Sequence, residues 1–297
     1  MTVKALANGS GRRTRRSGRR RPPIRRQLSS SLKHAILLLY AIAALFPIAL
    51  VFSVAVKSPA QVASDPFSLF TSFSFDNLAM AWTNGHFSNY FLNSLLLTIP
   101  STAISVVVCL LAGYAFARLR FPFRTFFFYL VLFALLVPFF AFMIPLFYEM
   151  RALGLLNTVV GANLVIASGT VAVGTFFMRA FFSDLPDELE QAARLDGCSE
   201  LQIFLRVMLP LVRSGMVGLV IYIFVQNWNN FLVPLIMFPN GSFLPLPTGL
   251  YAWSTSRIND YGAVAAAAVV AVLPILVLFV VMQRQFTRGF IMGAVKG

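Results

Sequence analysis

The chain has 297 residues, of which 58% are apolar and only 11% are charged. Soluble domains are about 45–50% apolar and about 25% charged, so this composition excludes an ordinary soluble domain and indicates a membrane protein. The net charge of +14 is concentrated at one end, because residues 1–33 contain 11 of the 24 Lys and Arg residues and no acidic residue.

Residues 1–33 are therefore predicted to form a basic, disordered segment, since like charges repel one another. Such a run can bind nucleic acid, but its place directly before an apolar segment favours another use. We expect it to lie against anionic lipid and to retain the N-terminus in the cytoplasm, with no nucleic-acid partner. The paired arginines are also typical of an export signal, yet the apolar segment that follows exceeds the roughly 7–15 residues of the apolar region in a signal peptide.

Six apolar segments are long enough to cross a bilayer as helices, which takes about 20 residues. They cover residues 34–56, 89–116, 123–150, 157–182, 214–237 and 262–282. With the N-terminus in the cytoplasm, 21 of the 24 basic residues fall on that side and only Lys57, Arg151 and Arg257 on the other. The positive-inside rule supports this orientation. The sequence thus predicts an all-α, polytopic membrane protein with six transmembrane helices over residues 34–297 and both termini in the cytoplasm.

The chain lacks the motifs of several enzyme classes. It contains no Walker A motif, no G-x-S-x-G elbow and no H-E-x-x-H pair, so we expect no catalytic residue and no bound cofactor. The cysteines (Cys109, Cys198) and histidines (His34, His86) are too few and too far apart for a metal site. All ten acidic residues fall outside the predicted membrane midplane, which disfavours an ion-coupled transporter.

The predicted spans instead contain neutral polar groups, with two interpretations. A cluster on the fifth span comprises Gln226, Asn227, Trp228, Asn229 and Asn230, and a hydroxyl run on the second comprises Ser94, Thr98, Ser101, Thr102 and Ser105. Amides beside aromatic rings suit the hydroxyls of a neutral solute such as a sugar. The alternative is hydrogen bonding between helices, worth about 0.6 kcal/mol each. The cluster on the fifth span is the stronger candidate for a substrate pathway.

Residues 183–213 form a charged segment between two spans and are predicted to fold as a cytoplasmic helix–turn–helix. Asp187 or Ser183 is a candidate N-cap, and Leu189, Ala192, Ala193 and Leu195 form an apolar stripe. Gly197 is expected to make the turn, and Pro210 to end the second helix. The hairpin could lie on the membrane surface. The glycine turn and the mixed charges favour a docking element for a soluble partner.

The hairpin also resembles the signature of binding-protein-dependent ABC importer permeases, E-A-A, three residues, Gly, nine residues, I-x-L-P. Here the pattern reads Gln191-Ala192-Ala193, Gly197 and Val207-Met208-Leu209-Pro210. Gln191 stands in place of the glutamate, and Glu188 and Glu190 close by retain the charge locally. Residues 93–121, 154–158, 228–231 and 283–297 are similar to the sugar-importing, maltose-type second subunit. That branch more often has an acid where Asn230 stands.

The resemblance implies a type I importer permease whose hairpin contains a coupling helix that docks into an ATPase subunit. The residues implied in coupling are Glu190, Gln191, Ala192, Ala193, Asp196, Gly197, Val207, Leu209 and Pro210. ATP and Mg would bind to a partner ATPase dimer. A second, different permease subunit and an extracytoplasmic binding protein would complete the importer in the cytoplasmic membrane.

The implied function is import of a sugar or oligosaccharide. A polyol or sugar phosphate is the alternative within the same class. An ion-coupled transporter acting alone and a membrane scaffold without a pore are the alternatives outside it.

Overall fold

The computed structural model describes residues 24–71, 73–257 and 260–294, with side chains described between residues 32 and 281. Within these ranges all regular structure is helical. Residues 1–23, most of the predicted basic segment, lie outside the described residues. The chain divides into two compact units, Met1–Ala49 and Leu50–Gly297.

Helix α1 (Ile24–Ala55) begins ten residues before the first predicted span. The expectation of disorder is therefore wrong for residues 24–33. Residues 24–46 contain neither proline nor glycine, and Arg, Gln, Leu and Lys are all good helix formers. Side chains 32–48 are exposed and mainly apolar, with a mean hydropathy of 2.7 over the span, as suits a helix in contact with lipid.

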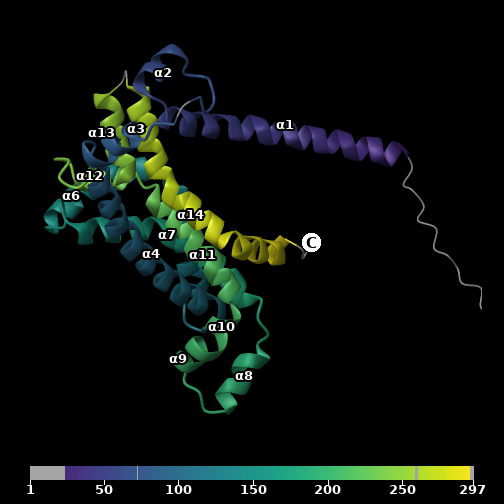
Figure 1. Ribbon diagram of the computed structural model, residues 1–297. Helices are drawn as coiled ribbons and strands as arrows, with labels where there is room; N and C mark the ends of the chain where they lie inside the picture. The colour runs from purple at the N-terminus through teal and green to yellow at the C-terminus, as the bar shows by residue number, and fades with distance from the viewer. Residues whose placement is uncertain (1–23, 72, 258–259, 295–297) are drawn as a thin grey trace, which may run out of the picture. The chain divides into compact units, whose positions relative to one another are not determined.

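The predicted all-α membrane fold is confirmed. In the described part of the chain, four helices are long and apolar enough to cross a membrane: α1, α4 (Phe87–Arg118), α7 (Val159–Ser183) and α14 (Tyr261–Ala294). The number rises to six if each of two bent helix pairs is counted as one span. Figure 1 shows α4, α7 and α11 (Arg213–Trp228) running alongside one another.

The third predicted span is not one straight helix. It consists of α5 (Arg124–Phe133), a 3₁₀ turn η1 (Ala134–Leu136) and α6 (Phe139–Ala152), and the two arms meet at 101°. Pro138 causes the break, because proline disfavours the helical region for the residue before it. Val137 is accordingly extended, with φ −86° and ψ 114°.

The fifth predicted span ends nine residues early. Helix α11 stops at Trp228, and a separate short helix, α12 (Leu232–Met237), follows. A continuous helix would place the ring of Pro234 against the carbonyl of Asn230, whereas the first turn of a new helix tolerates proline. Before α11, the helical stretch Glu200–Leu211 meets it at 82°.

Small residues and hydroxyls join α4 to α7. A Cβ built on Gly113 would lie 2.7 Å from the Cβ of Met178, so the two backbones approach closely. Ser105 Oγ donates to the carbonyl of Ala167 at 3.1 Å, and Thr170 Oγ1 donates to Ser105 Oγ at 3.0 Å. The whole hydroxyl run of α4 is buried. These residues therefore hold helices together, as small and hydroxyl residues do in membranes.

Three short helices lie at the end of α4 opposite the hairpin: α2 (Pro59–Ser64), α3 (Asp76–Thr83) and α13 (Leu246–Ser256) (Figure 1). Lys57 is fully buried there, and its Nζ donates to Asp65 O at 2.8 Å and to Ser68 Oγ at 2.9 Å. Leu246 N donates to Ser94 Oγ at 2.8 Å. The connecting loops thus close one end of the helix bundle and leave the hairpin at the other.

Gly113→Ala is expected to lower the thermal unfolding midpoint of the purified chain in detergent. The new Cβ would meet Met178 Cβ at 2.7 Å and the backbone nitrogen of Arg179 at 3.0 Å, and such overpacking costs about 1–3 kcal/mol. Gly169→Ala is the matched control, because nothing lies within 4 Å of its added Cβ. Equal midpoints for the two variants would contradict the close packing of α4 on α7.

Candidate functional site

The charged segment folds as the predicted helix–turn–helix. Helix α8 (Glu188–Leu195) is followed by a turn at Gly197, whose φ of +80° is in the left-handed region that favours glycine. The second arm runs through α9 (Glu200–Gln202), a π-helical stretch η2 (Ile203–Met208) and α10 (Leu209–Leu211). Ser199 and Gln202 form a reciprocal capping box at its start. We name residues 184–211 the hairpin.

The inner face of the hairpin packs onto the ends of α4 and α7. Phe204 lies with its ring centroid 5.1 Å from that of Tyr114 on α4 and 6.2 Å from that of Phe182 on α7. Ala193 is 6% exposed in the same cluster. The predicted apolar stripe is therefore only partly inside, since Leu195 is 89% exposed. Successive side chains of an α-helix are rotated by about 100°, so the side chains of Ala193 and Leu195 point to nearly opposite sides of α8.

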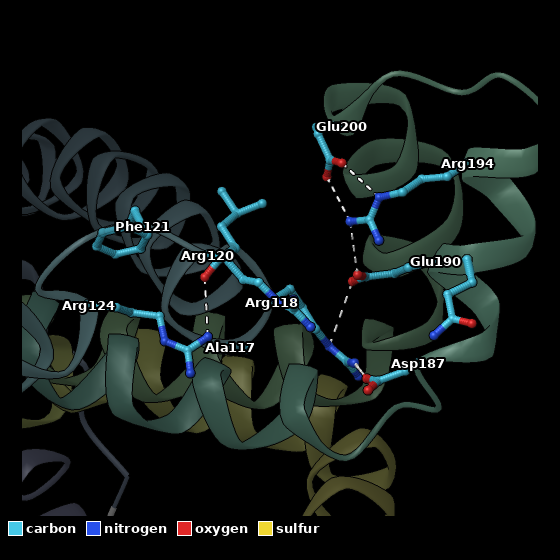
Figure 2. A pocket seen from close by; sticks show the side chains of 11 residues that line it. Ala117, Arg118, Arg120, Phe121, Arg124, Asp187, Glu190, Arg194 and Glu200 are labelled. Carbon is cyan, nitrogen blue, oxygen red and sulfur yellow. Dashed lines mark hydrogen bonds and ion pairs between the residues drawn. The ribbon is translucent and has the colours of Figure 1, made fainter.

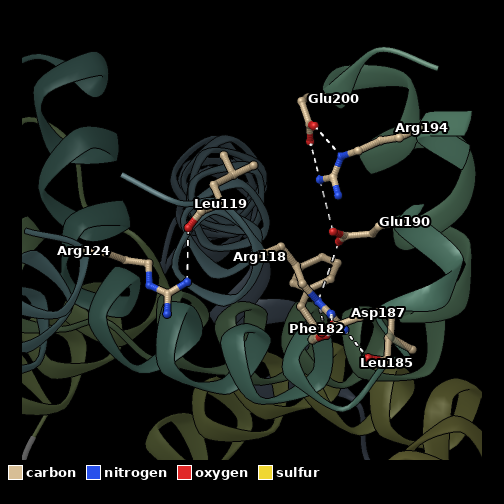
Figure 3. Close-up of polar contacts among 9 residues, drawn as sticks. All are labelled: Arg118, Leu119, Arg124, Phe182, Leu185, Asp187, Glu190, Arg194 and Glu200. Atoms are coloured by element: carbon tan, nitrogen blue, oxygen red, sulfur yellow. Dashed lines mark hydrogen bonds and ion pairs between the residues drawn. The ribbon is translucent and has the colours of Figure 1, made fainter. Parts of the chain in front are cut away.

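Arg118, the last residue of α4, ties the hairpin to the membrane helices (Figure 3). Its Nε and Nη2 donate to the carbonyl of Phe182 at 2.9 and 2.6 Å, and Nη2 also donates to the carbonyl of Leu185. Nη1 pairs with Asp187, and Nε lies 3.7 Å from Glu190 Oε1. The side chain is only 5% exposed. One guanidinium thus connects α4, the end of α7 and the first arm of the hairpin.

This arrangement corrects the predicted capping of α8. Asp187 occupies the N-cap position, but its carboxylate makes no capping hydrogen bond. It pairs with Arg118 instead, because a charged hydrogen bond to a buried guanidinium is stronger than a neutral one. Ser183 belongs to the last turn of α7, so it does not cap α8 either.

A second arginine links the two arms of the hairpin. Arg194 Nε lies 2.8 Å from Glu200 Oε1, and its Nη2 lies 3.4 Å from Glu190 Oε2. The hydrogen bond from Arg194 lowers the pKa of Glu200, so this carboxyl is charged at neutral pH. Glu190, whose side chain is 6% exposed, therefore lies between two guanidinium groups.

The hairpin and the turn after α4 enclose a cavity of about 870 Å³ (Figure 2). Its walls carry charges of both signs, contributed by the end of α4, the start of α5 and the hairpin. The lining residues are Ala117, Arg118, Leu119, Arg120, Phe121, Arg124, Asp187, Glu190, Gln191, Arg194 and Glu200.

The nine predicted coupling residues fall into three groups. Gln191, Ala192, Asp196, Gly197 and Pro210 are exposed, Val207 and Leu209 are half-buried, and Glu190 and Ala193 are buried. Glu190 therefore does not replace the missing glutamate of position 191 on the outer surface, because its carboxylate faces Arg118 and Arg194.

Sequence reasoning missed Arg118, Arg194 and Glu200 as parts of the site. Arg118 was counted only for membrane topology. One signal was available: residues 184–206 contain six acidic residues but only two arginines. This excess of acids favours a basic residue from elsewhere in the chain near the hairpin, but only Glu190 of the six is buried, and the sequence does not say which acid needs a buried cation.

The amide cluster divides between packing and a cavity. Asn227 Nδ2 lies 3.1 Å from Ser101 Oγ and 3.2 Å from Thr102 Oγ1, and Trp228 Nε1 donates to the carbonyl of Ala271 at 3.3 Å. Both side chains are buried. Asn227 and Trp228 thus hold α11 against α4 and α14.

Gln226 and Asn230 line a cavity of about 240 Å³ between α7 and α11, and Asn227 also borders it. Gln226 Nε2 donates to the hydroxyl of Tyr222 at 3.2 Å, so Tyr222 joins the cluster although sequence reasoning missed it. The lining contains no charged residue: Ile166, Gly169, Thr170, Tyr222, Gln226, Asn227 and Asn230. Asn229 lines a neighbouring cavity of about 290 Å³ together with Asn230.

Comparison with known proteins agrees with this geometry. Residues 105–291 match the family described as binding-protein-dependent transport system inner membrane component. The chain is 33% identical to the diacetylchitobiose uptake system permease protein NgcG of Streptomyces coelicolor, over 90% of this chain and 89% of that protein. It is 32% identical to the lactose transport system permease protein LacG of Rhizobium radiobacter, over 92% and 98%.

A solved structure shares the fold. It is described as a bacterial ABC transporter involved in the import of the acidic polysaccharide alginate. The TM-score is 0.78 at 24% sequence identity, covering 88% of this chain and 97% of the matched chain.

Arg118→Lys is expected to loosen the hairpin. Lysine carries the charge on one compact group and cannot reproduce the fork of the guanidinium, so contacts with Phe182, Leu185, Asp187 and Glu190 cannot all be kept. Limited proteolysis of the folded chain should cut near residues 195–199 several-fold faster. Arg206→Lys, the same change at an exposed hairpin arginine, should leave the rate unchanged. Equal rates for the two variants would refute the role of Arg118.

Proposed function

The chain belongs to the family of binding-protein-dependent transport system inner membrane components, and from this premise we propose that it is the permease subunit of an ABC importer for a sugar or oligosaccharide. The family is one of inner-membrane transport proteins, and the helices of the described chain are apolar enough for that setting. The predicted family resemblance is thereby confirmed.

The hairpin is the proposed docking element for an ATPase subunit. Its outer surface presents Gln191, Ala192 and Gly197, which are small or uncharged, and the apolar Leu195. Exposed leucine on a helix that is firmly attached on its other face suits insertion into an apolar groove of a soluble partner. Small neighbours permit close approach of that partner to the backbone.

Arg118 provides the proposed route by which movement of the hairpin reaches the membrane. Arg118 is the last residue of α4. Its guanidinium contacts the end of α7 and the start of the first hairpin helix. A force on the hairpin is therefore applied to two long membrane helices together. Helices packed as closely as α4 and α7 transmit such a displacement as rigid bodies.

The cavity between α7 and α11 is the proposed contribution of this subunit to the substrate pathway. Tyr222, Gln226 and Asn230 supply an aromatic ring, a hydroxyl and amides there. Such groups satisfy the hydroxyls of a saccharide, whereas the absence of a cation from the lining disfavours a sugar phosphate. Several relatives are named for the transport of diacetylchitobiose, arabinooligosaccharides or lactose, which supports a carbohydrate.

The importer as proposed contains further subunits. An ATPase dimer would bind ATP and Mg, a second permease chain would complete the pathway, and an extracytoplasmic binding protein would deliver the solute to the outer loops. Both termini and the hairpin would then lie in the cytoplasm, as the distribution of basic residues favours.

The observation that carries the coupling role is the exposed glycine turn of the hairpin. Gly197→Trp is expected to abolish co-purification of the ATPase subunit and uptake of the solute, because a bulky side chain at this turn blocks close docking. Gly241→Trp is the matched control: Gly241 also has a positive φ, +66°, with nothing within 4 Å of an added Cβ, but lies in the predicted outer loop.

Three results decide this test. Loss of the ATPase from Gly197→Trp but not from Gly241→Trp supports the docking role. Normal recovery of the ATPase with Gly197→Trp contradicts it. Uptake by the chain alone in liposomes without ATP would replace the proposal with an ion-coupled transporter.

Gln226→Ala is expected to raise the solute concentration for half-maximal uptake about five-fold, the effect of losing one hydrogen bond of about 1 kcal/mol. Its thermal unfolding midpoint should stay unchanged. Asn227→Ala is the contrasting variant, since it removes buried contacts with Ser101 and Thr102 and should lower the midpoint. If both variants alter only stability, Gln226 has no part in the pathway.

A further inference from the structure

The turn between α4 and α5 carries a second cavity, which shares Arg120, Phe121 and Arg124 with the larger one. Its volume is about 480 Å³, and it is lined by Arg120, Phe121, Phe123, Arg124 and Thr125. All five residues come from one short stretch of chain, and no hairpin residue is among them. We propose that this turn binds the headgroup phosphate of an anionic phospholipid.

The guanidinium groups of Arg120 and Arg124 are not neutralised by any carboxylate in the described part of the chain and are therefore available to bind an anion. The nearest carboxylates, on the far side of the larger cavity, are already engaged by Arg118 and Arg194 (Figure 2). Arg120 is exposed and makes no ion pair with any residue in the described ranges. Arg124 Nη1 donates only to the neutral carbonyl of Leu119, at 3.2 Å. Two guanidinium groups thus face the cavity without a carboxylate.

Neutral donors complete the recognition of a phosphate. Helix α5 begins at Arg124 without a side-chain cap, and its first hydrogen bond runs from Phe127 N to Phe123 O. The amides of the first turn, up to residue 126, therefore lack a partner within the helix. Free amides at a helix start favour an anion, and the hydroxyl of Thr125 lies in the same cavity.

The apolar side chains beside the cavity distinguish a lipid from a free phosphate. Phe123, Phe126 and Leu130 are 75%, 62% and 53% exposed. Phe126 and Leu130, four residues apart, lie on one side of α5, and Phe123 directly precedes the helix with a left-handed backbone. The other side packs inward through Phe128, whose ring lies 4.0 Å below the guanidinium of Arg179. An acyl chain can therefore follow the exposed side of α5 away from the phosphate.

The position of the turn relative to the membrane also suits a lipid headgroup. Helix α4 has a mean hydropathy of 2.3 and ends at Arg118, and the apolar part of α5 begins after Arg124. Residues 119–123 hence lie where a membrane helix gives way to polar headgroups. Arginines at that level attract anionic lipid with about 1 kcal/mol each.

The test uses the full chain with whatever subunits co-purify, exchanged into nanodiscs of phosphatidylcholine and phosphatidylglycerol. Native mass spectrometry after release counts the phosphatidylglycerol retained per chain. Arg120→Gln should weaken this retention about five-fold, and the double variant R120Q/R124Q on the order of 20-fold. Arg151→Gln removes the same charge at the end of α6, away from the turn, and should have no effect.

The outcomes separate the possible ligands. Loss with R120Q but not R151Q, with phosphatidylcholine retention unchanged, supports the lipid site. Displacement of the lipid by added inorganic phosphate assigns the turn to a free anion and overturns the proposal. Equal retention of phosphatidylglycerol by wild type and R120Q also overturns the proposal. This result is expected if another subunit covers the turn. R120Q alone suffices for this decision if the double variant fails to fold.

Discussion

A buried guanidinium at the end of α4 is the constraint on which the rest of the site depends. The side chain of Arg118 is 5% exposed, and burying a charge without partners is costly. Its environment therefore has to supply acceptors, and it does so with two backbone carbonyls and the carboxylate of Asp187, while Glu190 forms a longer ion pair at 3.7 Å. The carbonyl of Phe182 in the last turn of α7 and that of Leu185 just after it both accept from this guanidinium. Moving the hairpin would leave several charged or polar groups unpaired at once, which fixes its place against the membrane helices.

The fixed inner face leaves the outer face of the hairpin exposed. Glu190 and Ala193 lie one turn apart on the buried side of α8, whereas Gln191, Ala192 and Leu195 lie on the exposed side. The family signature thus has a buried side attached to the membrane helices and an exposed side that the proposed ATPase partner would contact. In this chain the carboxylate next to the signature serves attachment, and the outward position is a neutral glutamine.

Neighbouring amides within the membrane also have different tasks. Gln226 and Asn227 are adjacent, so their side chains point about 100° apart on α11. Gln226 lines the cavity beside Tyr222 and donates to its hydroxyl, whereas Asn227 borders the same cavity but donates to Ser101 and Thr102 on α4. Hydrogen bonds of the second kind hold the bundle together where no water is available. Bundle packing and the lining of a cavity therefore fall to neighbouring side chains of a single helix.

The sequence by itself determined the membrane class, the long helices α1, α4, α7 and α14, the hairpin with its turn at Gly197, and the family. These follow from composition, from apolar length and from local rules for glycine and helix caps, which act over a few residues. The breaks after Leu136 and Trp228 were readable only in part, because a proline in a membrane helix can either kink or end it. The tertiary structure alone decided that Arg118 meets Asp187 and Glu190, and which amide of residues 226–230 faces a cavity. Such contacts join residues about 70 to 130 positions apart, and no periodicity along the chain records which distant side chain fills a given space.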